Sequence, residues 1–248
     1  MADPIHQFII QPIADIEIAG YDLSFTNSSL WMVIGAVVST LFLTVAMRRN
    51  AMIPGRFQMC AEIVFEFVTK MVNENIGPKG RQYFPFIFTL FMFVLMGNML
   101  GLLPYAFTYT SHLIVTIGCA ILIFLMTICF GLYNHGLKFF GMFIPPGAPW
   151  WLLPFILPLE LISFFVRPIT HSVRLFANMM AGHLILKIVI SFAISAASLG
   201  GAWFALGIFP TLFNVIMLAF ELLVAGIQAY VFAILACVYL KDSVDLHH

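Results

Sequence analysis

Long stretches without a charged side chain constrain this 248-residue chain more than any other feature of its sequence. A helix that crosses the ~30 Å hydrocarbon core of a membrane needs about 20 mostly apolar residues. Several of the charge-free stretches reach that length, and the second is long enough for two crossings. The alternating segments of a membrane β-barrel are not found. The runs without Asp, Glu, Lys or Arg are residues 23–47, 82–137, 139–159, 188–220 and 222–240.

The composition excludes the soluble classes of protein. Apolar residues make up 62% of the chain and charged residues 9%, against about 45–50% and 25% in a typical globular protein. So few charges could not cover a soluble surface, which excludes a soluble enzyme, a nucleic-acid binder and a disordered regulator. The chain also contains no P-loop, no GxSxG and no HExxH motif.

We therefore expect an all-α polytopic membrane protein with five crossings and one interfacial amphipathic helix. The interfacial helix is indicated by Glu62, Glu66, Lys70 and Glu74, which recur every four residues and so share one helical face. The whole chain, 1–248, is expected to be a single membrane domain. Its expected parts are an outside N-terminal segment (1–27), a first span (28–49), the surface helix (57–77), two spans (83–135) and a long hairpin (150–240).

The basic residues predict the orientation of the spans. Arg48, Arg49, Arg56, Lys79, Arg81 and Lys138 all fall in connections on one side if the spans alternate as expected. Cytoplasmic connections are enriched in Lys and Arg, so we expect the N-terminus outside and the C-terminus in the cytoplasm.

The two arms of the last hairpin are too long for upright membrane helices. Residues 150–198 would form a helix of ~74 Å, and residues 203–240 one of ~57 Å. Either each arm is broken, for example at Pro154, Pro158 or Pro168, or both are long helices far from the membrane normal. The sequence leaves both alternatives open.

This hairpin carries two ladders of polar side chains in its apolar surroundings. Glu160, Arg167 and Arg174 recur every seven residues on the first arm, with Ser163 and Asn178 close to their face. Asn214, Glu221 and Gln228 recur every seven residues on the second arm and cover ~21 Å. An ionisable side chain deep in a membrane is costly and by default indicates function. The ladders predict hydrated paths for an ion.

Structural explanations for individual residues remain open. Arg167, Lys187 and Lys241 would also be explained by side chains that reach toward lipid headgroups. Glu160 would be explained as a partner of Arg167, and His183 as a hydrogen-bonded packing residue. Asn98, Asn214 and Gln228 would be explained as amides that link helices. A purely structural Arg174 is hardest to accept, because it lies deep in an apolar element beside other polar groups.

Two other functional classes fit the sequence less well. A haem-binding subunit would need His side chains paired across facing helices, but the only deep histidines, His171 and His183, lie on one element. A stand-alone secondary transporter or ion channel could use the same ladders, but it would be expected to show an inverted repeat, and none is found.

Three motifs resemble those of one family. The run Arg174-Leu175-Phe176-Ala177-Asn178-Met179-Met180-Ala181-Gly182-His183 resembles the first signature of subunit a of F-type ATP synthases, the membrane stator subunit. Glu221 followed by Gln228-Ala229-Tyr230-Val231-Phe232 is similar to the second signature. Asn98 to Pro104 resembles a third, although Gly101 stands where family members often carry an acidic residue.

The resemblance implies a proton-translocating subunit that is not catalytic by itself and holds no cofactor or metal. Its partners would be a ring of c subunits, b-type stator subunits, the other ATP synthase subunits and lipids, but no nucleic acid. Arg174 takes the place of the essential stator arginine. The resemblance favours a bacterial inner membrane over the mitochondrial one. By the match, the outside half-channel holds Asn178, His183, Glu221 and Gln228, to which we add Asn214 and Asn98, and the cytoplasmic half-channel holds Glu160 and Ser163.

Overall fold

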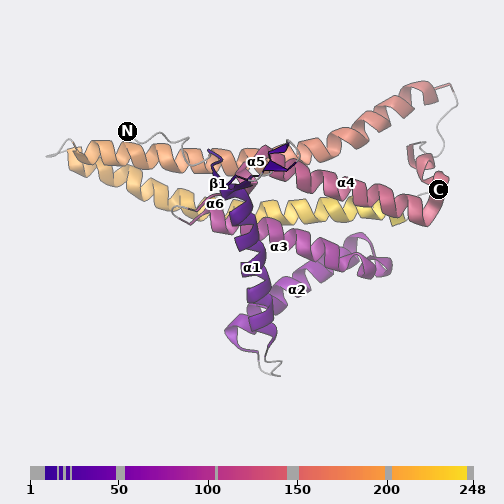
Figure 1. Cartoon of the computed structure of the whole chain (residues 1–248), viewed down its shortest axis with the longest axis horizontal. Helices are drawn as coiled ribbons and strands as arrows, with labels where there is room; N and C mark the ends of the chain where they lie inside the picture. The colour runs from indigo at the N-terminus through magenta and orange to yellow at the C-terminus, as the bar shows by residue number, and fades with distance from the viewer. Residues whose placement is uncertain are drawn as a thin grey trace. The chain divides into compact units, whose positions relative to one another are not determined.

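The computed structural model of the chain describes residues 9–15, 17–18, 21–22, 24–48, 54–103, 106–143, 151–198 and 203–244. Six α-helices account for most of these residues (Figure 1). They are α1 (Asn27–Met47), α2 (Arg56–Asn75), α3 (Phe84–Gly101), α4 (Leu113–His135), α5 (Leu153–Ser198) and α6 (Trp203–Val244). Three short 3-10 helices connect them: η2 (Pro78–Gln82), η3 (Tyr109–Ser111) and η4 (Gly136–Phe143).

Within the part of the chain that the structure describes, strands are confined to short pairs before α1. β1 (Pro12–Ala14) pairs antiparallel with β4 (Phe25–Thr26), and β2 (Glu17–Ile18) pairs antiparallel with β3 (Tyr21–Asp22). Asn27 ties this region to α1, because its side-chain amide donates to the Ile9 carbonyl at 3.2 Å and its oxygen accepts from the Ser28 amide at 2.9 Å.

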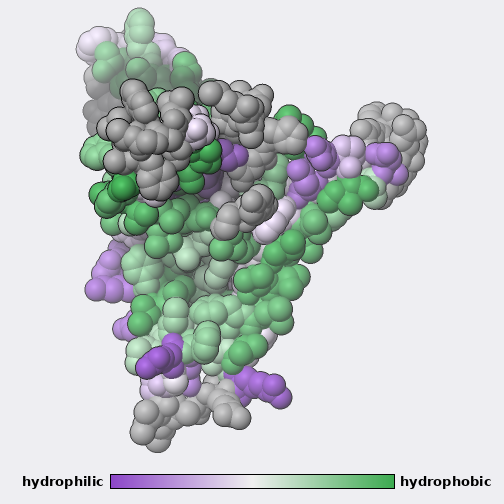
Figure 2. Space-filling model, turned by 90° about the vertical axis from the view of Figure 1, so that its left-hand side faces the viewer, coloured by the Kyte–Doolittle hydropathy of each residue, from purple (hydrophilic) through white to green (hydrophobic). Residues whose placement is uncertain are grey.

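Five helices within the described residues are long and apolar enough to cross a membrane, which confirms the predicted number of crossings. They are α1, α3, α4 and most of α5 and α6. Large apolar side chains such as Val45, Ile114 and Phe209 are more than half exposed to the surroundings, and Figure 2 shows apolar residues over much of the face in view. Lipid suits such a surface, since hydrocarbon solvates these side chains without the penalty that water imposes.

The long arms of the hairpin are unbroken helices. Pro158 and Pro168 lie inside α5, and Pro210 lies inside α6, yet both helices continue through them (Figure 1). At 46 and 42 residues, they measure ~69 and ~63 Å. The first of the two open alternatives, broken arms, is therefore wrong. The strong tilt of both arms in the membrane remains a prediction.

The chain divides into two compact units. Unit 1 holds residues 1–40, 93–112 and 175–229, and unit 2 holds residues 41–92, 113–174 and 230–248. In unit 1, Ala225 and Ala229 of α6 are fully buried, and the Ala225 carbonyl accepts a hydrogen bond from Asn98 of α3. Small residues at such positions let helix backbones approach closely, which is how helices associate within a membrane.

Unit 2 contains the predicted amphipathic helix. This helix is α2. Its buried face packs inward and consists of Gln58, Ala61, Val68, Met71 and Val72. Phe65 contacts the ring of Phe84, at the start of α3, at a centroid distance of 4.9 Å. The acidic and basic side chains lie outward, with Lys70 and Glu74 3.9 Å apart and well exposed. The amphipathic pattern is thus present, and its position at the membrane surface remains a prediction.

Unit 2 is further tied together by polar contacts at the ends of its helices. The Asn134 amide donates to the Tyr83 hydroxyl at 3.2 Å, and His135 Nε2 lies 3.1 Å from the Val244 carbonyl. Gly131 lets Phe139 of η4 pack directly on α4, since a Cβ there would lie 2.3 Å from its ring. These contacts hold the end of α4 against the start of α3 and the end of α6.

Candidate functional site

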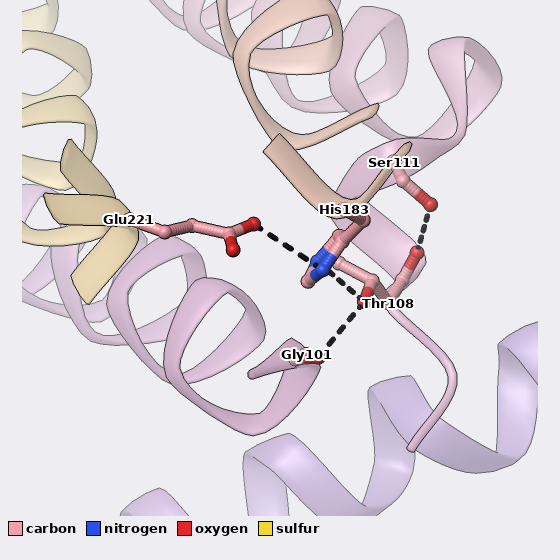
Figure 3. Close-up of polar contacts among 5 residues, drawn as sticks. All are labelled: Gly101, Thr108, Ser111, His183 and Glu221. Atoms are coloured by element: carbon pink, nitrogen blue, oxygen red, sulfur yellow. Dashed lines mark hydrogen bonds and ion pairs between the residues drawn. The ribbon is translucent and has the colours of Figure 1, made fainter. Parts of the chain in front are cut away.

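A buried contact between an acid and a histidine forms the centre of the site in unit 1. Nδ1 of His183, on α5, lies 3.2 Å from Oε1 of Glu221, on α6 (Figure 3). The two residues are only 7% and 4% exposed. The separation is that of an ion pair, but neither Glu221 oxygen has hydrogen-bond geometry with any described residue. The pair is therefore a close contact between an acid and an imidazole, and not an ideal hydrogen bond.

A glycine lets the two helices bring this pair together. Gly182 precedes His183, and a Cβ built there would lie 2.7 Å from Oε1 of Glu221. That distance is below van der Waals contact, so any larger residue would push the carboxylate away. The same G-H dipeptide that carries the resemblance thus supplies both the imidazole and the space for its partner.

The loop between α3 and α4 contacts the other nitrogen of the histidine. Oγ1 of Thr108 lies 3.0 Å from His183 Nε2 and 3.4 Å from the carbonyl oxygen of Gly101 (Figure 3). The Ser111 hydroxyl donates to the Thr108 carbonyl at 2.6 Å, and the Tyr109 hydroxyl donates to the Phe93 carbonyl at 2.8 Å. These bonds hold the loop against α3, so Thr108 has a defined position beside the imidazole.

Three predicted channel residues line one cavity on the other side of Glu221. This cavity in unit 1 has a volume of about 320 Å³ and is lined by Asn178 and Gly182 of α5 and by Glu221 and Gln228 of α6, together with apolar side chains. A cavity of this size holds several waters, and its amides and carboxylate offer the polar partners that water needs. Asn178, Glu221 and Gln228 can therefore face a common hydrated space.

The remaining two amides predicted for this half-channel lie apart from the cavity lining. The Asn98 side-chain amide is fully buried and donates to the Ala225 carbonyl at 3.1 Å. This contact is the helix-linking role that had remained open for Asn98, although its Oδ1 has no partner among the described residues. Asn214 is half-buried, and its Oδ1 likewise has no described partner.

A second polar cluster lies in unit 2. A cavity of about 430 Å³ is lined by Ser163, Arg167, Thr170, His171 and Arg174 of α5 and by Tyr239 of α6, among others. The predicted ladder of the first arm therefore converges on one cavity, except for Glu160. Its Oε1 lies 3.6 Å from a guanidinium nitrogen of Arg167, so the pairing of these two residues that the sequence left open is present. Both side chains are more than one-third exposed.

Arg174 differs from Arg167 in its surroundings. It is exposed beside this cavity, and it makes no hydrogen bond or ion pair with any residue that the structure describes. A guanidinium with five donors and no acceptor partner is a strong binding site for a carboxylate. Arg174 can therefore receive an acidic group from outside the chain.

His171, which had no assigned role, is buried one turn before Arg174. Its ring stacks on Phe232 at a centroid distance of 4.2 Å, and its Nε2 lies 3.4 Å from the Phe232 carbonyl. The next residue, Ser172, lies 3.2 Å from the Thr116 hydroxyl of α4. These contacts hold the buried side of α5 at His171 and Ser172 against α6 and α4.

Sequence reasoning missed Thr108 and Gly182. Thr108 contacts His183, and Gly182 leaves space for the Glu221 carboxylate. Thr108 lies in a loop, where side chains follow no period that would assign them a face. The signal available was the run Thr108 to Ser111, four polar residues next to a membrane span. Among the described residues, no group of three His, Cys, Asp or Glu side chains could hold a metal ion.

Comparison with known proteins agrees with the motifs. Residues 29–241 match the family model described as ATP synthase A chain. ATP synthase subunit a of Agrobacterium fabrum is 50% identical over 246 residues, which cover 99% of both chains. The proteins of the same name from Parvibaculum lavamentivorans and Paramagnetospirillum magneticum are 48% and 46% identical, over 99% and 100% of this chain and 95% and 100% of theirs. The chain therefore belongs to the ATP synthase A chain family.

Proposed function

We propose that this chain is the proton-translocating stator subunit of a rotary F-type ATP synthase. It provides two offset half-channels that lead to carboxylates on a ring of c subunits, with Arg174 between them. The chain performs no catalysis by itself. Its membership of the family and its five apolar helices support this function.

The observation that carries the proposal is the buried contact between His183 and Glu221, next to a cavity that is large enough to hold several waters. An acid and an imidazole buried this deeply in apolar helices are costly unless they serve each other or a moving ion. Together they can take up a proton from the outside aqueous phase by way of the cavity that Asn178, Glu221 and Gln228 line. Asn214 extends this ladder toward the outside end of α6, while Asn98 holds α3 to α6.

The ring carboxylate supplies the reason for two separate paths. A carboxylate must be neutral while it faces lipid, because a bare charge there costs many kcal/mol. A proton from the outside half-channel neutralises it, and the ring can then turn. After nearly a full turn the carboxylate reaches the cytoplasmic half-channel, near Glu160 and Ser163, and releases the proton. The driving force is about 2.3 kcal/mol per charge per 100 mV, in addition to the pH difference.

Arg174 prevents the proton from passing directly between the paths. Its guanidinium stays charged at any working pH, so it cannot relay a proton. It also stabilises the ionised form of a passing carboxylate and so promotes release. Its exposure, without a described acceptor partner, is what this role requires.

The family also suggests the partners and the location. We infer a c-subunit ring, b-type stator subunits and the other subunits of the synthase as partners. The multi-pass chain would lie in a bacterial inner membrane, with its N-terminus outside and its C-terminus in the cytoplasm. The bacterial origin of the relatives supports this location.

Replacement of the acid tests the proposal. Glu221→Gln in the assembled complex should lower passive proton conduction and ATP-driven pumping by at least tenfold, because an amide cannot take up a proton. The pH dependence of conduction should also change, since a carboxylate and an imidazole in contact titrate as a pair. The measurement is proton flux into vesicles that contain the membrane sector, with the pH varied on the outside face.

Glu74→Gln on α2 is the matched control, because that carboxylate is exposed and contacts only Lys70 among the described residues. It should leave conduction and its pH profile unchanged. An unaltered rate and profile in fully assembled Glu221→Gln complexes would make the His183–Glu221 pair structural and contradict the proposed path.

A stand-alone transporter or channel remains the alternative function. It would conduct protons when the purified chain alone is placed in vesicles. The stator function instead requires the chain to purify together with c and b subunits and to conduct only in their presence. Joint purification followed by flux measurements with and without the ring separates the two.

A further inference from the structure

We propose that Thr108 is a positioning residue for proton uptake, whose hydroxyl hydrogen turns between two acceptors as His183 changes its protonation state. This inference rests on the function proposed above and concerns the same site. Its chemistry is that of a hydroxyl that donates to a neutral imidazole and accepts from a charged one.

The geometry offers the hydroxyl two alternative acceptors. Thr108 Oγ1 lies 3.0 Å from His183 Nε2 and 3.4 Å from the Gly101 carbonyl oxygen (Figure 3). A hydroxyl has one hydrogen and two lone pairs, so it can donate to only one of them at a time. Thr108 is itself 3% exposed, which leaves these two groups as its nearby polar partners among the described residues.

The two protonation states of the histidine require opposite roles of Thr108. When His183 is neutral with its hydrogen on Nδ1, that N–H faces the Glu221 carboxylate, and Nε2 accepts from Thr108. When a proton from the channel binds Nε2, the N–H there donates to Thr108 Oγ1, and the hydroxyl hydrogen turns to the Gly101 carbonyl. The new N–H is the only covalent bond that this step adds to the site. The net charge of the pair of Glu221 and His183 rises from minus one to zero.

Gly101 provides the space for this arrangement. A Cβ built at that position would lie 2.5 Å from Thr108 Oγ1 and 2.6 Å from its Cγ2. The Thr108 side chain therefore occupies the place that a side chain at position 101 would take. It brings a hydroxyl where the third family motif often has an acid, so the loop supplies the polar group that α3 lacks.

Few other ionisable groups can compete with this contact. Glu221 faces His183 from α6, and Lys187 lies one turn further along α5 and disfavours a second positive charge. The part of α3 in unit 1, residues 93–101, carries no charged side chain. In the loop, the ring of His112 stacks on Phe107 at 4.8 Å. The pH response of this site therefore depends on Glu221, Lys187 and the hydroxyl of Thr108.

The test compares Thr108→Val, Thr108→Ser and Thr110→Val in the assembled membrane sector. Valine keeps the shape but removes the hydroxyl, and a bond to a charged donor is worth more than one to a neutral acceptor. The loss of the hydroxyl should therefore destabilise the protonated form of the His183–Glu221 pair more than the unprotonated form. The pH midpoint of passive proton conduction should then fall by about half to one unit. Serine keeps the hydroxyl and should restore the wild-type midpoint.

Thr110→Val is the matched control. Thr110 lies in the same loop, is 1% exposed, and its hydroxyl has no hydrogen-bond partner among the described residues. Its replacement should leave the midpoint unchanged. Gly101→Ala, which displaces Thr108 without removing its hydroxyl, should move the midpoint in the same direction as Thr108→Val.

An unchanged midpoint in Thr108→Val, an equal shift in Thr108→Ser, or an equal shift in Thr110→Val would each overturn the role of Thr108. Glu221→Gln, measured in the same vesicles, separates this failure from that of the proposed function. If it alters the pH profile while Thr108→Val does not, only the inference about Thr108 is wrong. If neither does, the proton path through this pair is wrong as well.

Discussion

Glu221 and His183 occupy the environment in which ionisable side chains are costliest. Both are almost completely buried, between helices whose other residues are mainly apolar. Removing one partner of such a pair leaves an uncompensated polar group, and the cost is typically several kcal/mol. A helix pair that only needed to be stable would be better served by apolar residues at both positions, which is why we propose that the pair takes up protons.

Gly182→Ala tests the close approach on which this pair depends. The added methyl group would lie 2.7 Å from the Glu221 carboxylate and must displace it from His183. We expect at least a tenfold loss of proton conduction in assembled complexes. Gly226→Ala on α6 is the control, because nothing described lies within 4 Å of a Cβ there, and it should conduct normally. Normal conduction in Gly182→Ala would show that the contact in Figure 3 is not needed.

The seven-residue spacing predicted which residues share a helical face, but not what each residue meets on that face. Glu221 and Gln228 line one cavity with Asn178, as a shared face implies. Asn214 belongs to the same ladder but lies outside that lining. Thr108 could not have been assigned at all, because a loop has no period that relates position to direction. Only the folded chain brings it to within 3.0 Å of His183.

At the scale of elements, the long helices α5 and α6 decide where the polar ladders lie. Their prolines remove a backbone donor and usually kink or end a helix, which is why broken arms were a reasonable alternative from the sequence. Within a membrane, however, a helix that stops leaves several backbone groups without partners, at several kcal/mol each. Continuation through Pro158, Pro168 and Pro210 avoids that cost.

The face of α6 that bears the ladder should be the one that water reaches. After replacement of the native cysteines, single cysteines at Asn214 and Glu221 should react with a small hydrophilic thiol reagent added from the outside. A cysteine at Leu223 should not, because that position lies ~160° from the ladder and its apolar side chain is 57% exposed, as a lipid-facing residue would be. Equal labelling at all three positions, or none at 214 and 221, would contradict an aqueous path on this face.

The amphipathic pattern of α2 predicts its depth in the membrane. Spin labels at Phe57 and Glu66 would lie on opposite sides of α2, because nine residues turn a helix by about two and a half turns, and both residues are exposed in the structure. If α2 lies in the interface, the label at 57 should collide mainly with oxygen, which enriches in lipid, and the label at 66 with a water-soluble nickel complex. Equal exposure of both labels to the nickel complex would show that α2 lies in water.

At the scale of the whole molecule, most of the fold could be predicted because membrane solvation leaves few choices. With 9% charged residues, the number and approximate bounds of the spans follow from the positions of the charge-free stretches. The division into two compact units could not be predicted, nor could the polar cavities that the structure describes in them. It depends on contacts between distant segments, such as that of Asn98 with Ala225, for which local sequence carries no signal.

The two polar clusters could serve rotary transport only if protons cannot pass directly from one to the other. One cluster in unit 1 is suited to take up a proton, and one in unit 2 contains two arginines and no described acid in its cavity lining. A path that simply joined them would let protons pass without turning the ring. We propose that the fixed charge of Arg174 is the barrier that makes transport depend on rotation, because it favours an ionised carboxylate and cannot carry a proton.

Arg174→Ala in the complete synthase, reconstituted into vesicles, tests this claim most directly. ATP synthesis driven by an imposed proton gradient and passive proton flux are measured on the same preparation, with Arg174→Lys beside it. We predict no synthesis and no ATP-driven pumping in either variant, because an ammonium lacks the planar fork and can lose its proton when buried. Passive flux in Arg174→Ala should persist or rise. Coupled synthesis at the wild-type rate in the assembled Arg174→Ala complex would contradict the account.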